Sequence, residues 1–269
     1  MRWNPSANIS FNKNEVLALA PGQTQIIAGD IGSIITKVGG PIAEYYGYQI
    51  MGVYKTQNQF NDPKTPKLPG TQMGDYIVKD VNGDGVIDTK DWRPMGTYSP
   101  KFTYGFSNSF AYKNFSLSFS LTGVEGRKVY ESNLASRGEA GEGFALPTKY
   151  YFENRYHPID NPNGIFAQPN LGNFSAARRA TKASNLYILN ADYLRLRDVQ
   201  LAYTLPSYVV KRAKIANMKI YVGGNNLFTI TKYRGTNPEG TTGSALTNGQ
   251  ATSNYPIART FIFGTNISL

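Results

Sequence analysis

The sequence has no cysteine, a single histidine and no long apolar run, and each of these absences excludes a class of protein. Without cysteine there is no disulfide framework, thiol nucleophile or thiolate metal site. A histidine-based catalytic triad would depend on His157 alone, and the motifs of serine hydrolases, zinc peptidases and phosphate-binding loops are absent. No stretch reaches the roughly 18 apolar residues of a membrane-spanning helix. We expect no enzyme, although a carboxylate pair of the glycosidase kind stays open, because a sequence does not show distances in space.

Acidic residues are also scarce, with 18 Asp and Glu against 28 Lys and Arg and a formal net charge of +10. This excess suits a solvated basic surface, anionic lipid, an anionic substrate or nucleic acid. The basic residues are scattered, apart from Arg178-Arg179 and the group Lys211, Arg212 and Lys214. No recognition helix, RNA-binding signature or zinc finger accompanies them, so no nucleic-acid partner is expected.

What the sequence does contain is a repeated alternation of apolar and polar residues. It is clear in Phe102–Tyr112, Phe115–Leu121 and Arg259–Leu269, and weaker in Met218–Ile230. A β-strand sends successive side chains to opposite faces, so each segment predicts a strand with one aromatic-rich face. The other face is nearly all Ser, Thr, Gly and Asn, whereas soluble sheets usually place charges there. The pattern favours a transmembrane β-barrel over a soluble β-sandwich, whose buried face also alternates.

The densest group of potential metal ligands is the twelve-residue run from Asp80 to Asp91. It matches the calcium-loop pattern, in which alternating oxygen ligands surround the ion and a glycine makes the sharp turn. The predicted ligands are Asp80, Asn82, Asp84, the Val86 carbonyl, Asp88 and Asp91. Four carboxylates this close in sequence repel one another without a cation, although an Asx-rich turn without metal is the alternative. We expect a structural calcium ion that fixes a long loop, with Ile87 anchoring the loop on apolar neighbours.

Several motifs resemble one family, the SusC/RagA family of TonB-dependent outer-membrane transporters. They follow one another in the family's order: Asn8–Asn14, Tyr76–Phe106, Asp192–Pro206, Gly224–Phe228, Arg234–Glu239 and Tyr255–Phe261. The resemblance covers nearly the whole chain and corresponds to the carboxyl-terminal part of the family. Two positions depart from it, because Asn237 stands where Asp is frequent and Leu269 where an aromatic residue is commoner.

The resemblance implies an all-β fold, in which residues 1–269 supply about seven antiparallel strands of a 22-stranded transmembrane barrel with long extracellular loops. The plug domain and the TonB box are expected to lie outside this sequence. The start, Met1–Pro5, has no apolar core of a signal peptide, which fits a piece of a longer protein. The expected strands are Trp3–Asn12, Tyr45–Tyr54, Phe102–Tyr112, Phe115–Leu121, Tyr193–Thr204, Met218–Ile230 and Arg259–Leu269.

Connection lengths predict the topology. The two-residue turn Lys113-Asn114 is expected on the periplasmic side, together with Leu205–Asn217, in which Ser207–Ile215 forms a short helical turn. The long segments Lys55–Lys101, Gly123–Asp192 and Thr231–Ala258 then lie outside. Lys13–Glu44 does not fit this count, since it is long and would also be periplasmic, which suggests a missed strand.

The segment Gly123–Asp192 is too long for a plain connection. Its aromatic residues suit contact with sugar or peptide, packing of the loop on itself, or contact with a partner. These residues are Tyr150, Tyr151, Phe152, Tyr156, His157 and Phe166. His157, which precedes Pro158, is expected to be an ordinary loop residue.

The function implied by the resemblance is uptake of glycan or peptide oligomers across the cell outer membrane. The implied partners are a SusD-like surface lipoprotein, the TonB complex (through the missing amino-terminal part), outer-membrane lipid, and the oligosaccharide or peptide substrate. The alternative is a calcium-stabilised extracellular β-domain that acts in adhesion or carbohydrate binding.

Overall fold

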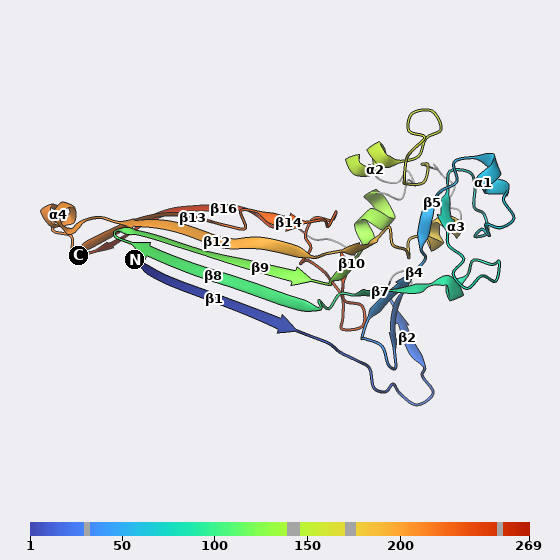
Figure 1. The fold of residues 1–269 in the computed structure, drawn as a ribbon, viewed down its shortest axis with the longest axis horizontal. Coiled ribbons are helices and arrows are strands. Elements are labelled where there is room, and N and C mark those ends of the chain that lie inside the picture. The colour runs from blue at the N-terminus through green and yellow to red at the C-terminus, as the bar shows by residue number, and fades with distance from the viewer. Residues whose placement is uncertain (30–32, 139–145, 170–175, 252–254) are drawn as a thin grey trace.

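The computed structural model of the chain describes residues 1–29, 33–138, 146–169, 176–251 and 255–269. Its shape is elongated, with a long single-layer sheet that ends in a folded head (Figure 1). Both chain termini lie at the end of the sheet away from the head. We call this end the distal end.

The sheet is antiparallel throughout, with the strand order β1-β8-β9-β12-β13-β16. Its strands are β1 (Arg2–Phe11), β8 (Phe102–Tyr112), β9 (Phe115–Glu125), β12 (Tyr193–Thr204), β13 (Asn217–Asn225) and β16 (Thr260–Ser268), with the short β14 (Thr229–Thr231) also paired to β12. The six long strands contain 9 to 12 residues each. A tilted transmembrane β-strand needs roughly 9–11 residues. The strand lengths therefore match the thickness of a bilayer.

The register of the sheet gathers the alternating residues into one apolar and one polar face. Leu117 lies opposite Phe110 on one side and Leu201 on the other, and Leu201 lies opposite Val222, which faces Phe263. The adjacent row on the other face consists of Ser109, Ser118, Gln200 and Gly223. The alternation in the sequence is therefore a real division between two surfaces.

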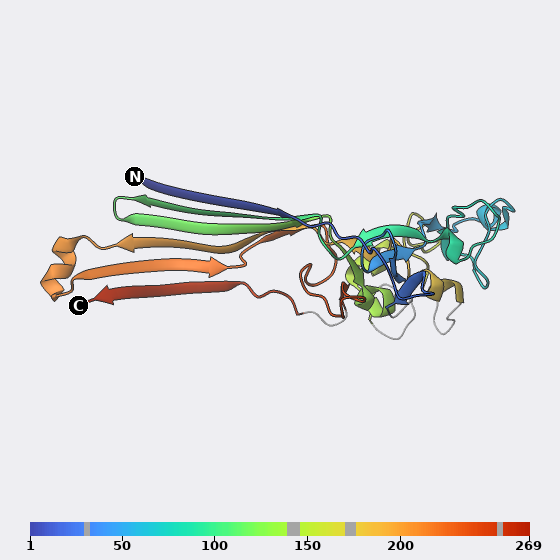
Figure 2. The ribbon, with the colours of Figure 1, turned by 90° about the horizontal axis from the view of Figure 1, so that it is seen from below.

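The apolar face is open rather than packed against a second sheet. Trp3, Phe261 and Phe263 are 56%, 79% and 78% exposed. Figure 2 shows that the sheet is one layer thick along its length. A soluble sandwich would bury such rows against a second sheet, because exposed apolar surface of this extent is unfavourable in water. The described residues thus support the membrane-facing interpretation.

One of the seven expected strands is wrong. Tyr45–Tyr54 lies in the head, where it forms β4 (Glu44–Gly47) and β5 (Ile50–Val53) in two small sheets. Tyr45, Tyr46 and Tyr54 are all buried, so this stretch has no polar face to turn to a lumen. The seventh strand of the large sheet is β14 instead.

The pairing of β1 with β8 explains why Lys13–Glu44 did not fit the predicted topology. β1 pairs directly with β8, so the described residues between these strands lie at the head end of the sheet and not with the short turns of the distal end. The strands described within Lys13–Glu44 are Gln25–Ala28 and Ile34–Lys37, and they pair in a separate small sheet. The head thus collects the described residues of 12–101, 126–192 and 232–259 at the same end of the sheet.

The head is built from three small sheets and several short helices. The sheets are β2 (Gln25–Ala28), β3 (Ile34–Lys37), β4 and β7 (Arg93–Thr97); β5 and β6 (Tyr76–Val78); and β10 (Lys128–Glu131), β11 (Ile188–Asn190) and β15 (Gln250–Ala251). The helices are α1 (Gln57–Asn61), η1 (Thr89–Asp91), the π-helix η2 (Leu134–Gly138), α2 (Lys149–Asn154) and α3 (Ala176–Ala180). Most of the buried apolar residues lie in the head.

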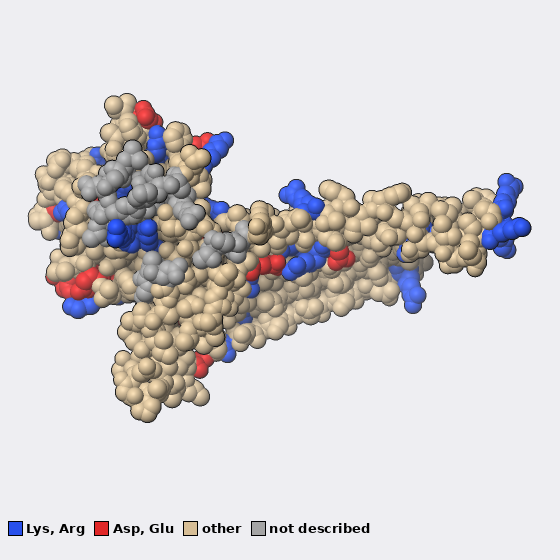
Figure 3. Space-filling view, turned by 180° about the vertical axis from the view of Figure 1, so that it is seen from behind, with Lys and Arg blue, Asp and Glu red and all other residues tan. Residues whose placement is uncertain are grey.

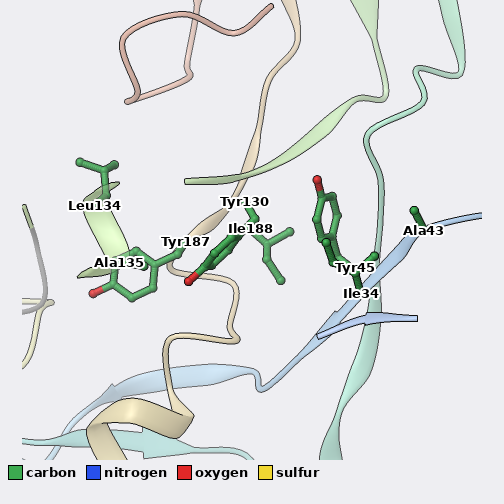
Figure 4. Close-up of a cluster of buried hydrophobic side chains, with 8 residues drawn as sticks. All are labelled: Ile34, Ala43, Tyr45, Tyr130, Leu134, Ala135, Tyr187 and Ile188. Carbon is green, nitrogen blue, oxygen red and sulfur yellow. The ribbon is translucent and has the colours of Figure 1, made fainter. Parts of the chain in front are cut away.

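The head has its own hydrophobic cores, drawn from segments that are far apart in the sequence. One core joins Ile34 and Tyr45 of the first long segment to Tyr130, Tyr187 and Ile188 of the second (Figure 4). Tyr45 is fully buried and its hydroxyl donates to the Gly249 carbonyl at 2.7 Å, in the third segment. The three long connections therefore form one packed unit, not independent loops.

The distal end has only short connections, as predicted. Lys113-Asn114 is a tight turn, in which Lys113 adopts a φ of 53°. The other connection contains α4 (Ser207–Val210) and the 3-10 turn η3 (Lys211–Ala213), so the expected short helical turn is present. The Ala216 amide donates to the Ser268 carbonyl at 2.9 Å, which ties this connection to the last strand.

Candidate functional site

Two arginines of β12 and one glutamate of the head meet on the polar face, where the sheet enters the head. Arg195 Nη1 donates to Glu239 Oε2 at 2.6 Å, and Arg197 Nη2 donates to Glu239 Oε1 at 2.7 Å. The Tyr193 hydroxyl also donates to Glu239 Oε1. The Arg195 side chain is 2% exposed and that of Glu239 is 21% exposed. We call Tyr193, Arg195, Arg197 and Glu239 the carboxylate latch, because it holds the segment 232–251 to the sheet.

A β-bulge in β12 places the arginines of the latch. The pairing of β12 with β9 shifts at Arg197, which is the extra residue, so Arg195 lies opposite Thr122 while Asp198 lies opposite Ser120. A bulge of this kind re-aims a side chain that would otherwise follow the regular pleat. Arg197 Nε donates to Thr122 Oγ1 at 3.1 Å, so the guanidinium lies along the polar face.

The segment that carries Glu239 is also fixed within the head. β15 pairs in parallel with β10, and the Tyr233 hydroxyl donates to Glu131. Burial, followed by the nearby Glu131 charge, raises the pKa of Tyr233 far above its ordinary value. The Tyr233 hydroxyl therefore stays protonated and acts as a donor. The latch is the point at which this fixed segment contacts the wall of the sheet.

The predicted calcium-loop residues lie between β6 and β7, on the side of the head remote from the sheet (Figure 1). Asp80 accepts from the amides of Gly83 at 2.6 Å and Gly85 at 2.9 Å, and Asp84 accepts from the Val86 amide at 2.9 Å. Side-chain oxygens thus hold the turn through backbone amides. Ile87 is 4% exposed and packs in a core cluster, which confirms its anchoring role.

Asp88 and Asp91 close the loop as a reciprocal cap. Asp91 accepts from the Val81 amide at 2.8 Å and the Asp88 amide at 3.0 Å, and Asp88 accepts from the Lys90 amide at 2.7 Å. Burial acts to raise the pKa of the Asp91 carboxyl, but the amides that donate to it outweigh burial and hold that pKa below its usual range. Asp91 is therefore a carboxylate at neutral pH.

All six predicted ligand residues lie in this one loop. Within the described ranges, no group of three or more His, Cys, Asp or Glu side chains is arranged to hold a metal ion. The calcium site therefore stays a prediction from the sequence pattern, and the loop is closed by its own hydrogen bonds.

The aromatic residues of the long segment divide into two groups. Tyr151, Tyr156 and Phe166 are 2%, 6% and 2% exposed and form a core cluster, so for them the packing alternative is correct. Tyr150 and Phe152 of α2 are 44% and 54% exposed. The Tyr150 ring meets Phe166 edge-on at 5.7 Å and the Arg155 guanidinium lies 3.9 Å from the Phe152 ring, so only part of each side chain is open to solvent.

His157 behaves as an ordinary loop residue, as expected. Its Nδ1 accepts from the Asp160 amide at 3.0 Å and the Ile159 amide at 3.3 Å, and it lies 3.4 Å from an Asp160 carboxylate oxygen. These contacts shape a turn.

Sequence reasoning missed two polar pairs that organise the head. One is the carboxylate latch, whose arginines lie in the family-like motif Asp192–Pro206 and whose glutamate lies in the motif Arg234–Glu239. The other is the ion pair between Arg178 Nε and Asp75 Oδ1 at 2.7 Å, with side chains 7% and 5% exposed. The residues of each pair are far apart in the sequence, so no local spacing indicates the contact.

None of the helices in the described part of the chain is long and apolar enough to cross a membrane. No protein-family model matches the chain. Individual proteins do match it. The chain is 29% identical to TonB-dependent receptor P3 of Formosa agariphila over 277 residues, which cover 98% of this chain and 26% of the relative. It is 24% identical to TonB-dependent receptor SusC of Bacteroides thetaiotaomicron, over 98% of this chain and 24% of that protein.

Solved structures of transporters also align with nearly the whole chain. The structure of the RagAB peptide transporter aligns with a TM-score of 0.71 at 21% identity, over 98% of this chain and 27% of the transporter chain. The open-open state of the RagAB peptide importer aligns with a TM-score of 0.66 at 22% identity, over 99% of this chain and 27% of that chain. At this identity the likeness shows the fold.

The resemblance to TonB-dependent receptors of the SusC/RagA kind, stated from the sequence motifs, is confirmed over nearly the whole chain. The relatives are named as receptors and transporters, not enzymes. The chain spans about a quarter of the length of the relatives it matches.

Proposed function

We propose that this chain forms part of the wall and external mouth of an outer-membrane transporter. The observation that carries the proposal is the open sheet of bilayer-spanning length, with an aromatic-rich face on one side and small neutral polar residues on the other. The polar face suits the watery interior of a wide barrel. A recess on it is lined by Arg2, Asn4, Gln200 and Lys219, among others, as expected of a hydrated surface.

The absence of native cysteine offers a direct test. Leu117→Cys and Ser118→Cys place single thiols at adjacent positions of β9, on the apolar and polar faces. In lipid vesicles, a water-soluble maleimide is expected to label the thiol at position 118 and spare the one at position 117. Unfolding in denaturant is the control that exposes both thiols. Equal labelling of both in the folded, vesicle-bound chain would contradict the proposal and favour an extracellular soluble domain.

The finer proposal is that the complete transporter imports peptide or glycan oligomers with a SusD-like lipoprotein and is energised by the TonB complex. The likeness to TonB-dependent receptors supports TonB dependence, and the likeness to the RagAB peptide transporter supports peptide as cargo. The exposed side chains of Tyr150, Phe152 and Ile165 on the head support contact with a partner or cargo, since exposed apolar groups on one surface mark interaction sites. Phe152→Ser is expected to weaken co-purification of the lipoprotein or uptake of labelled peptide, whereas the nearby Glu153→Gln leaves both unchanged.

We also propose that the loop from Asp80 to Asp91 binds calcium and is stiffened by it. The support is the match to the calcium-loop pattern together with the anchored Ile87. Calorimetry with calcium is expected to show heat for the unaltered chain and none for Asp80→Ala/Asp84→Ala. Asp160→Ala, which removes an exposed carboxylate elsewhere in the head, is the matched control. Equal heats for the unaltered chain and the double variant would contradict the proposal.

A further inference from the structure

We infer that the distal end of the sheet binds anionic phospholipid headgroups. This inference rests on the proposed membrane location and adds which lipids contact this end of the wall. The surface is formed by the connection between β12 and β13 and by the adjacent β8–β9 turn. We call Lys113, Lys211, Arg212 and Lys214 the distal cations.

The charge at this end is of one sign. All four distal cations are exposed. Neither residues 102–124 nor residues 199–231 contain an Asp or Glu, so no acidic side chain of these strands neutralises them. Figure 3 shows basic side chains at the tip of the sheet with no acidic side chain beside them on that face. The α-carboxylate of Leu269 is also at this end and is a single opposing charge.

Apolar side chains accompany the cations in the arrangement found at a membrane surface. Tyr208 and Val209 of α4 are 73% and 42% exposed, while Val210 is 3% exposed and holds the turn on the sheet. Tyr112 and Phe115, on either side of the hairpin turn, are 58% and 54% exposed. Aromatic residues in barrels mark the level of the headgroups, and lysines just beyond them reach the phosphates.

The hairpin turn shows how the two kinds of residue cooperate. Lys113 Nζ lies 5.5 Å from the centre of the Tyr112 ring, so the ammonium group is held at the edge of the apolar face. The cations therefore sit where that face ends. This position fits lipid headgroups around the rim, because ammonium groups at the boundary of an apolar face lie at the level of the lipid phosphates.

The test uses tryptophan fluorescence in vesicles, because the sequence has only two tryptophans, Trp3 and Trp92. Trp92→Phe leaves Trp3 on the apolar face as the probe of membrane contact. Trp3→Phe/Trp92→Phe/Tyr208→Trp places the single probe on α4. Each protein is refolded as the full chain into vesicles that contain brominated phosphatidylglycerol or brominated phosphatidylcholine at the same mole fraction.

We expect the probe at position 208 to be quenched about twice as strongly by the anionic brominated lipid as by the neutral one, since each cation near an anionic surface strengthens binding roughly fivefold. Adding Lys211→Gln/Arg212→Gln/Lys214→Asn should remove this difference; Asn is used at 214 because Lys214 has a φ of 57°. Lys13→Gln/Lys64→Gln/Lys79→Gln removes the same charge from the head and should keep the difference. In the position-208 probe protein that keeps all four distal cations, 0.5 M salt should reduce the difference in quenching between the anionic and the neutral lipid.

The outcomes separate this inference from the proposed function. If Trp3 is quenched by both lipids but position 208 shows no preference, the membrane location holds and the lipid inference is overturned, leaving an acidic protein as the partner of these charges. A preference that survives loss of the three cations also overturns it. If Trp3 is quenched by neither lipid, the proposed membrane location itself fails.

Discussion

Replacing Glu239 by glutamine should loosen the segment that the carboxylate latch holds. Glu239→Gln keeps the shape of the side chain but removes the negative charge that both arginines contact. Arg195 is left with its Nε bond to Thr229 Oγ1 at 2.8 Å and with the Tyr193 ring 5.1 Å away. The guanidinium of Arg195 is then buried without a counter-ion, which is the unfavourable part of the change.

The magnitude follows from the two charge-assisted contacts. A hydrogen bond to a charged group contributes about 1.5–3 kcal/mol. The Arg197 contact is discounted, because that side chain is 44% exposed and water screens the pair. The latch then contributes about 2–3 kcal/mol to the local stability of the segment, mostly through Arg195. At 1.4 kcal/mol per factor of ten, opening becomes roughly 30- to 150-fold more frequent.

Hydrogen exchange measured by mass spectrometry checks this value. Peptides from residues 232–251 should exchange faster by that factor, while peptides from β8 and β9 should not change. Glu153→Gln is the matched control, because the Lys149–Glu153 pair spans 3.6 Å between side chains that are 86% and 55% exposed. Ion pairs this exposed contribute little to the stability of the fold. If residues 232–251 exchange at the same rate in Glu239→Gln as in the unaltered chain, the stabilising role of the latch is refuted.

Three further results are expected in the head. Asp75→Ala leaves the buried Arg178 guanidinium without its carboxylate and should lower the free energy of unfolding by about 3–5 kcal/mol, measured by denaturant titration. Phe166→Ala should cost about 3–5 kcal/mol in the same assay, and a loss below 1 kcal/mol would contradict its core position. Because the folded-state pKa of Tyr233 is raised by burial and by Glu131, stability is retained below about pH 10, the ordinary tyrosine pKa, and falls above it. In Tyr233→Phe the melting temperature should fall less between pH 9 and pH 11, and an unchanged slope would count against this role.

The strands of the wall could be predicted because their signal is local. Phe102–Tyr112 and Phe115–Leu121 alternate cleanly, and the two-residue turn between them leaves a single hairpin register. The structure places both strands as expected and extends the second to Glu125. The short helical turn after Pro206 was equally readable, since it follows from a proline and a short connection.

The head could not be derived in the same way. Tyr45–Tyr54 has the pattern of another strand of the wall, but the adjacent Tyr45 and Tyr46 are both buried, and this depends on cores supplied by distant segments. For Tyr151 and Phe166 the alternative of packing within the loop is confirmed, but the sequence did not show which of the aromatic residues would pack. Only the exposed α2 side chains keep the possibility of ligand contact.

The sequence alone determined the period of the strands and the chemistry of each face, because these properties depend on neighbours along the chain. Only the tertiary structure decided that the three long connections pack as one head and that Glu239 meets Arg195 and Arg197. The physical reason is that burial and ion pairing depend on which distant segments come together. A carboxylate and a guanidinium 44 residues apart carry no local sign that they will meet.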